Sequence, residues 1–291
     1  MPDPVAPISG PAEPARVRDE LRVTVIEPSR GISLRLQDIW AYRELLYLLI
    51  WRDIKVRYKQ TVLGAAWAVI QPFMTMVVFS VVFGALARIP SNDIPYPIFS
   101  YCGLLPWMYF ANSLSQASNS LVENQRLITK VYFPRLLLPL RSVVSGLVDF
   151  GISFLVLIGM MVYYSRFPSS NALWAVPVLI LLAAATALAV GLWLSALNVL
   201  YRDVRYTLGF LVQLWLFVTP VAYPSSLVPE PWQVWLGMNP MTGVVEGFRW
   251  ALLGGPAPGA LLWVSVGAVS VLLVGGLAFF RRMERVFADV I

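Results

Sequence analysis

Long runs of apolar residues alternate with short polar connections along most of this chain. A helix that crosses a membrane needs about 20 mostly apolar residues. The pattern predicts six such helices. They cover, roughly, Val62–Ala87, Ile98–Ala117, Leu136–Tyr164, Leu173–Val199, Tyr206–Tyr223 and Ala257–Phe280. We therefore expect an all-α membrane protein with six transmembrane helices.

A seventh apolar stretch, Pro231–Leu253, does not fit a simple span. One proline and three glycines interrupt it, and it carries Glu246 and Arg249 at a helical spacing that allows them to pair. Irregular backbone is tolerated at membrane depth only against protein or a watery cavity. The stretch therefore predicts a re-entrant or interfacial helical hairpin on the extracytoplasmic side, between spans five and six.

The segment before the first span divides into two parts. Residues 1–30 are rich in proline, alanine and charge, which predicts a flexible cytoplasmic arm and not a signal peptide. Residues 31–60 mix apolar and charged positions, which predicts an amphipathic interfacial helix leading into a six-span domain over 61–291. Arg52, Lys55 and Lys59 share one face of it. We expect this basic face to meet anionic head groups, or to act only as a topology anchor.

The composition supports membrane insertion and excludes several kinds of site. The chain has 291 residues, of which 58% are hydrophobic and 13% charged, whereas about a quarter of the residues of a soluble protein are charged. A lone cysteine, Cys102, excludes an intrachain disulfide. Histidine, the commonest metal ligand and general base, is absent. We predict no metal site and no catalytic residue.

The basic residues predict the orientation. If the spans alternate in direction, nineteen of the 22 Lys and Arg residues fall on one side, and only Arg88, Arg166 and Arg249 fall on the other. By the positive-inside rule, both termini are cytoplasmic. This asymmetry explains the net charge of +6 without a nucleic-acid partner.

The sequence lacks the motif that binds ATP phosphates. The lysines are Lys55, Lys59 and Lys130, and none follows a glycine as the lysine of a P-loop does. No LSGGQ-like signature and no acidic pair for a metal-bound nucleotide sugar is present. We therefore expect that the chain is not an enzyme by itself and holds no cofactor.

The predicted cytoplasmic loop 118–135 carries a helix signal. Ser120 and Glu123 form an S-x-x-E capping box, which predicts a short helix from Leu121. Pro134 would end it. A short charged helix between two spans suits a docking element for a soluble partner, and an ordinary amphipathic loop is the alternative.

Asp149 is the acid that lies well inside a predicted span. A carboxylate at the centre of a bilayer costs about 2.5–3.5 kcal/mol on insertion scales. Asp149 should therefore face a partner or a cavity. A structural hydrogen bond is favoured over proton coupling, because the spans offer no further acids for a relay.

Four separated stretches resemble the membrane subunit of the type-2 ABC exporters of bacterial polysaccharides. They are RDIKVRYKQTVLGAAWAVIQP (52–72), ENQRLITKVYFPRLLLPL (123–140), SALNVLYRDVRY (195–206) and NPMTGVVEGFRWALLG (239–254). They occur in the family's order and agree with the topology above, whereas the arm 1–30 lies outside the resembling pattern.

The resemblance implies partners and a location. Two copies of the permease would enclose a pore in the bacterial cytoplasmic (inner) membrane, above two ATPase subunits that bind ATP and Mg. The substrate would be a lipid-linked glycan such as the O-antigen of lipopolysaccharide, a capsule or a teichoic acid. The helix near Leu121–Thr129 would be the coupling helix that contacts the ATPase, with Ser120, Glu123, Asn124 and Arg126 as its candidate residues.

The resemblance also gives a role to aromatic and hairpin residues. Aromatic faces suit a pore wall for a sugar chain, because they contact sugar C–H surfaces without strong hydrogen bonds; packing and membrane-interface roles are the alternatives. The candidates are Trp67, Phe73, Phe79, Phe83, Tyr109, Phe210, Trp215 and Phe217. The hairpin would form the extracytoplasmic gate, with Asn239, Pro240, Glu246 and Arg249.

Other functions stay open at this point. A drug or lipid exporter of the type-2 class would share the topology but would not need an aromatic pore. A membrane glycan synthase is a less favoured alternative, because it would need catalytic residues in a large outer loop and the outer loops here are short.

Overall fold

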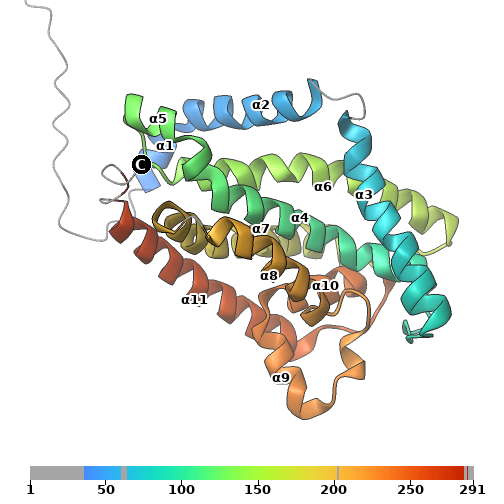
Figure 1. Cartoon of the computed structure of the whole chain (residues 1–291). Helices are drawn as coiled ribbons and strands as arrows, with labels where there is room; N and C mark the ends of the chain where they lie inside the picture. The colour runs from blue at the N-terminus through green and yellow to red at the C-terminus, as the bar shows by residue number, and fades with distance from the viewer. Residues whose placement is uncertain (1–35, 60–63, 202, 285–286, 288–291) are drawn as a thin grey trace, which may run out of the picture. The chain divides into compact units, whose positions relative to one another are not determined.

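The computed structural model describes residues 36–59, 64–201, 203–284 and 287, and every regular element within them is helical. In Figure 1 the long helices over Tyr96–Glu123, Leu137–Tyr163, Ala172–Leu200 and Gly259–Met283 form a bundle, with the shorter helices around it. The prediction of an all-α protein is confirmed. The predicted arm, residues 1–30, lies outside the described residues.

Four helical segments have the length and apolar composition needed to cross a membrane. They are Ala66–Leu86, Leu137–Tyr163, Ala172–Leu200 and Gly259–Met283. The first combines most of α3 (Gly64–Phe79) with a π-helical continuation over Ser80–Leu86; the others are α6, α7 and α11. They match predicted spans one, three, four and six, and confirm a multi-pass membrane protein.

The other two predicted spans are helices of a different kind. α4 (Tyr96–Glu123) has 28 residues but is less apolar, because serine, asparagine and tyrosine interrupt it. α8 (Val204–Val218) is apolar but has only 15 residues. The helices that pack against α4 and α8 are described below.

The core of the bundle forms around α4. Its buried residues contact α6, α7 and α10. Glycines allow the close approach: a Cβ on Gly146 of α6 would lie 2.6 Å from Ser113 Oγ of α4, and one on Gly191 of α7 would lie 2.9 Å from Ala117 Cβ. Small residues at such crossings let membrane helices pack backbone to backbone.

The predicted helix start at Leu121 is wrong. α4 continues through Ser120, and the short helix α5 covers Gln125–Lys130. The Ser120 hydroxyl donates to the Ala117 carbonyl at 2.7 Å, inside the helix, and so caps nothing. Leu121 is fully buried, and packing of this residue keeps the helix going until the backbone turns at Asn124.

The segment predicted to form the hairpin contains two helices, α9 (Glu230–Met238) and α10 (Pro240–Leu253). Asn239 separates them, and its side-chain oxygen accepts from the Met241 amide at 3.1 Å. Nearly all of α10 is buried against α4, α7 and α11. It is therefore an internal part of the bundle.

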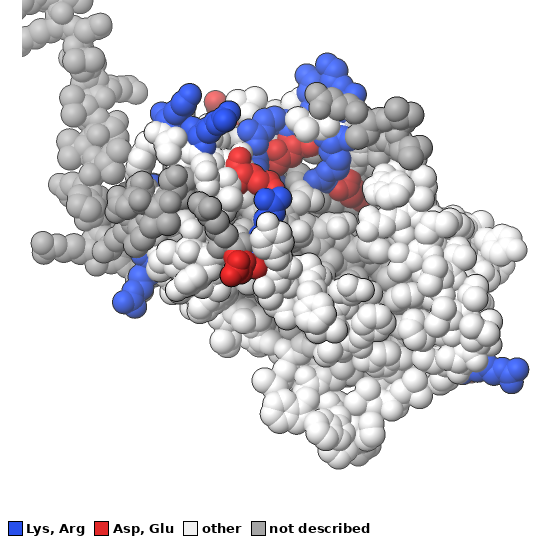
Figure 2. Space-filling view, viewed as in Figure 1, with Lys and Arg blue, Asp and Glu red and all other residues white. Residues whose placement is uncertain are grey.

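Residues 36–59 form two helices, α1 (Leu36–Ala41) and α2 (Arg43–Lys59). Leu49 of α2 is buried in a second hydrophobic cluster with residues of α4, α6, α7 and α11. α2 lies at the same end of the bundle as α5 (Figure 1). In the view of Figure 2, charged side chains gather at this end, and most of the remaining face is uncharged.

The close contact at Gly146 gives a stability prediction. Gly146→Val should lower the unfolding free energy by about 1–3 kcal/mol, because the added methyl groups overpack the α4–α6 crossing. The readout is the apparent Tm of the detergent-solubilised protein. Gly151→Val is the matched control on the same helix, since a Cβ there meets nothing within 4 Å. Equal melting of the two variants would contradict the packing argument.

Candidate functional site

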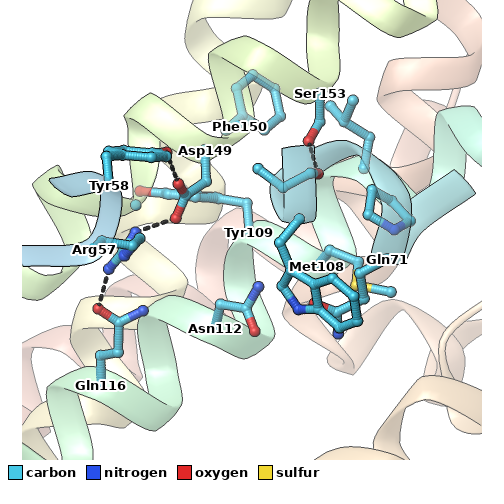
Figure 3. A pocket seen from close by; sticks show the side chains of 15 residues that line it. Arg57, Tyr58, Gln71, Met108, Tyr109, Asn112, Gln116, Asp149, Phe150 and Ser153 are labelled. Carbon is cyan, nitrogen blue, oxygen red and sulfur yellow. Dashed lines mark hydrogen bonds and ion pairs between the residues drawn. The ribbon is translucent and has the colours of Figure 1, made fainter. Parts of the chain in front are cut away.

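Ion pairs fasten α2 to α6. Asp53 of α2 pairs with Arg141 of α6 at 2.9 Å, and the Arg141 side chain is only 5% exposed. One turn further along α2, Arg57 and Tyr58 both bond to the carboxylate of Asp149 (Figure 3). Burial, and then the bond to Asp149, raises the pKa of Tyr58 above its ordinary value. We call these two connections the α2–α6 clamp.

Two further hydrogen bonds join α2 to α4 and to the residue that follows it. Arg57 donates to the Gln116 side-chain oxygen at 2.7 Å, and Arg52 donates to the Asn124 side-chain oxygen at 3.1 Å. Asn124 is the residue between α4 and α5. α2 is therefore bonded to Asn124, the residue that connects α4 to α5.

The clamp identifies the partners of Asp149. It also shows that the residues of the predicted basic face of α2 do not share one environment. Asp149 has both a partner and a cavity, as expected, but its partners come from α2 and not from another predicted span. Arg52 is engaged by Asn124 and by Asp53. Lys55 and Lys59 are exposed and bond to no residue in the described part of the chain.

A cavity of about 210 Å³ lies beside the clamp, between α2, α3, α4 and α6. Aromatic residues and side-chain amides are among the residues that line it (Figure 3). The wall formed by α3 is held to α6 where the Ser153 hydroxyl donates to the Ala68 carbonyl at 2.7 Å. Among the lining residues are Trp67, Gln71, Tyr109, Asn112, Gln116 and Phe150.

The structure divides the eight predicted pore aromatics by exposure. Trp67, Phe73, Phe210 and Phe217 are exposed on the protomer. Phe79 and Tyr109 are buried in its core, and Phe83 and Trp215 are partly buried against it. The first four present their rings at the surface of the chain, whereas the other four pack within it.

Two of the packed aromatics make specific hydrogen bonds. The Tyr109 hydroxyl donates to the Val143 carbonyl at 3.1 Å. The Trp215 indole donates to the Asn239 side-chain oxygen at 3.0 Å, and the Asn239 amide donates to the Thr219 hydroxyl at 2.9 Å. Asn239 thus joins the turn of the hairpin to the end of α8.

Glu246 and Arg249 form a buried pair at 3.3 Å, as their spacing predicts. The Arg249 guanidinium also donates to the Pro220 and Val221 carbonyls, both at 2.6 Å, and lies 3.7 Å from the centre of the Phe99 ring. Glu246 accepts from the Ser225 amide at 3.0 Å. The pair therefore organises the loop that follows α8, which sequence reasoning did not anticipate.

The four residues predicted for the coupling helix do not share one environment. Ser120 and Asn124 are buried, whereas Glu123 and Arg126 are exposed. Exposed groups around α5 are therefore available for docking, while Asn124 is engaged with Arg52. No group of three or more metal-binding side chains occurs among the described residues.

Residues 44–253, from α2 to the end of α10, match the sequence model of a family described as "ABC-2 type transporter". The chain is 30% identical over 260 residues to the O-antigen export system permease protein RfbA of Myxococcus xanthus, covering 88% of this chain and 98% of that protein. It is 24% identical over 246 residues to the polysialic acid transport protein KpsM of Escherichia coli, covering 83% and 93%. Identity to the inner membrane transport permease YadH of Escherichia coli (strain K12) is 22% over 229 residues, covering 75% and 83%.

Loss of the clamp should loosen α2. Asp149→Leu removes the acceptor shared by Arg57 and Tyr58. Because this pair is partly exposed, we expect a local cost of about 1–2 kcal/mol, which corresponds to roughly tenfold faster hydrogen exchange of the α2 amides. Exchange in α10 should not change.

Asp93→Asn is the control for this experiment, since the Asp93 carboxylate makes no ion pair with the described residues. Unchanged α2 exchange in Asp149→Leu would show that Leu49 and its apolar neighbours hold this helix without the clamp.

Breaking the buried pair in the hairpin should cost more. Arg249→Met leaves Glu246 and two backbone carbonyls without their donor, and removal of one partner of a buried pair costs about 3–5 kcal/mol. The apparent Tm should fall clearly below that of Arg166→Met, which loses one exposed bond to the Asp93 carbonyl. Adding Glu246→Gln to Arg249→Met should recover part of the loss. Equal Tm values for the two single variants would contradict this account.

Proposed function

The chain belongs to the ABC-2 type transporter family, and from that premise we propose that it is the permease of an ATP-driven exporter that moves a lipid-linked polysaccharide across the bacterial cytoplasmic membrane. The observation that carries this proposal is a likeness over nearly the full length of relatives named for O-antigen export and polysialic acid transport. ATP and Mg would bind to separate ATPase subunits.

The proposed topology has six spans: α3 with its π-helical continuation, α4, α6, α7, α8 and α11. Both termini would be cytoplasmic, and so would the end of the bundle where charged side chains gather in Figure 2. α8 rises about 22 Å, which is less than the roughly 30 Å of a bilayer core. The helices α9 and α10, bonded to the end of α8 through Asn239, would fill the remaining depth as a re-entrant hairpin from outside.

We propose that α2 lies in the cytoplasmic interface of the membrane. Its side chains Tyr47 and Trp51 are exposed, and so are the cations Lys55 and Lys59. Amphipathic aromatic side chains and cations are the groups that membrane interfaces favour. The clamp would then fix the height of α2 relative to the bundle.

Two copies of the chain would enclose the pore. The exposed aromatics on α3 and α8, Trp67, Phe73, Phe210 and Phe217, are the candidates for its wall. Phe79, Phe83, Tyr109 and Trp215 would support them from within the protomer. An aromatic wall offers contact to sugar C–H surfaces and few groups that would trap the chain.

The conformational change of the ATPase would be transmitted to the permease through α5. We propose that the exposed residues Glu123 and Arg126 contact the ATPase, and that the Arg52–Asn124 bond carries displacement of α5 to α2. The hairpin would close the outer end, with Asn239 and Pro240 at its turn and Glu246 and Arg249 holding the adjoining loop.

Deletion of the gene in its native host tests the substrate class. Lipid-linked glycan should accumulate on the cytoplasmic face of the membrane and disappear from the cell surface, measured by fractionation and surface labelling. The wild-type gene on a plasmid should restore the surface glycan. Unchanged surface glycan would overturn the proposal in favour of a drug or lipid exporter, and loss of glycan from both faces with intact precursor supply would indicate a synthase.

A further inference from the structure

The cavity beside the clamp has walls that are fixed from several sides. Arg57 and Tyr58 hold one side through Asp149, and Ser153 joins α6 to α3 on another. A packing defect in a membrane bundle would be apolar, whereas polar and apolar side chains both line this cavity. Its composition therefore suits a polar occupant and not an empty packing gap.

The apolar part of the lining is aromatic. Trp67 of α3 is 56% exposed, and Tyr109 and Phe150 also line the cavity. The rings of Tyr109 and Phe150 contact each other edge to face, with their centres 5.7 Å apart. Packing of this kind leaves rigid ring surfaces against which the C–H face of a flat, partly apolar ligand can lie.

The polar part of the lining has unused hydrogen-bonding capacity. The side-chain amides of Gln71 and Asn112 are exposed, and neither has a hydrogen-bond partner among the described residues. Asn112 extends from α4 into the space between the clamp and Met108 in Figure 3. Each amide both donates and accepts, which matches hydroxyl groups that do the same.

The charge of the cavity distinguishes between two parts of a lipid-linked glycan. Among the described residues, its lining contains one cation, Arg57, and one acid, Asp149, and these two are paired. A phosphate group would need a cation whose charge is not neutralised by an acid. The cavity suits a neutral, hydroxylated ring better than a phosphate.

We propose that this cavity binds one neutral sugar residue of the transported glycan, with Trp67 against its C–H face and Gln71 and Asn112 on its hydroxyls. The inference rests on the proposed export function. Trp67 and Gln71 lie on α3, the helix whose exposed aromatics are candidates for the pore wall, so a sugar in the cavity stays connected to a chain in the pore.

Equilibrium binding to the full transporter tests the inference. The permease is purified with its ATPase subunits in lipid nanodiscs, and the probe is a labelled short oligosaccharide released by mild acid from the host's own surface glycan. Gln71→Ala with Asn112→Ala should weaken binding about tenfold, because two hydrogen bonds are lost. Trp67→Ala should weaken it by a similar factor. Asn171→Ala is the matched control, an exposed amide at the start of α7 and outside the cavity.

Each variant must keep the wild-type apparent Tm and assemble with the ATPase, so that weaker binding reports the site and not the fold. Competition with a polyprenyl pyrophosphate that carries no sugar should be at least tenfold weaker than competition with unlabelled oligosaccharide. Equal competition would overturn the assignment of a neutral sugar.

The outcomes separate this inference from the proposed function. If the wild-type chain exports glycan in cells but the cavity variants bind the oligosaccharide as tightly as Asn171→Ala does, the sugar site is wrong and export stands. The sugar site is also wrong if the exporting wild-type protein binds no oligosaccharide. Failure of the wild-type chain to export glycan would overturn the proposed function itself.

Discussion

A charged side chain that is buried in a helical membrane bundle needs a partner of opposite charge. This constraint determines the structure at both ends of the bundle. Within the described residues, the charges that reach furthest into the bundle each meet a partner: Asp149 meets Arg57, Arg141 meets Asp53, and Glu246 meets Arg249. An unpaired charge in such surroundings is costly. Pairing therefore decides where α2 lies on one end and how the loop after α8 folds on the other.

The two charged regions are connected through adjacent residues of α6. Asp149 bonds to α2, whereas the next residue, Phe150, contacts Phe248 of α10 with ring centres 6.1 Å apart. Phe248 precedes Arg249, whose guanidinium holds the carbonyls after α8. Successive residues of a helix point about 100° apart, so one turn of α6 serves both the clamp and the hairpin.

Much of the fold could be predicted from the sequence, because apolar length and interruptions are local properties. The runs later seen as α3, α6, α7 and α11 stand out by hydropathy, and the glycines and Pro240 mark the hairpin. Local signatures failed where packing competed with them: Ser120 has the spacing of a cap, yet burial of Leu121 keeps α4 intact. The partners of Asp149 were missed because they lie more than 90 residues away, and helix periodicity carries no information on which helices meet. Exposure of the predicted pore aromatics could not be predicted either, because the residue type alone does not distinguish the exposed Trp67 from the buried Tyr109.

The same contacts constrain how this protein can move. α5 adjoins Asn124, Asn124 bonds to Arg52 of α2, and α2 is paired to the turn of α6 that contacts α10. Transmission along such a path requires an element with two arrangements, because a close-packed interior does not deform continuously. The tight glycine crossings of α4 with α6 and α7 oppose relative sliding of these helices. Rearrangement is therefore easier at the edges of the bundle, in α2 and the π-helical end of α3, than in its centre.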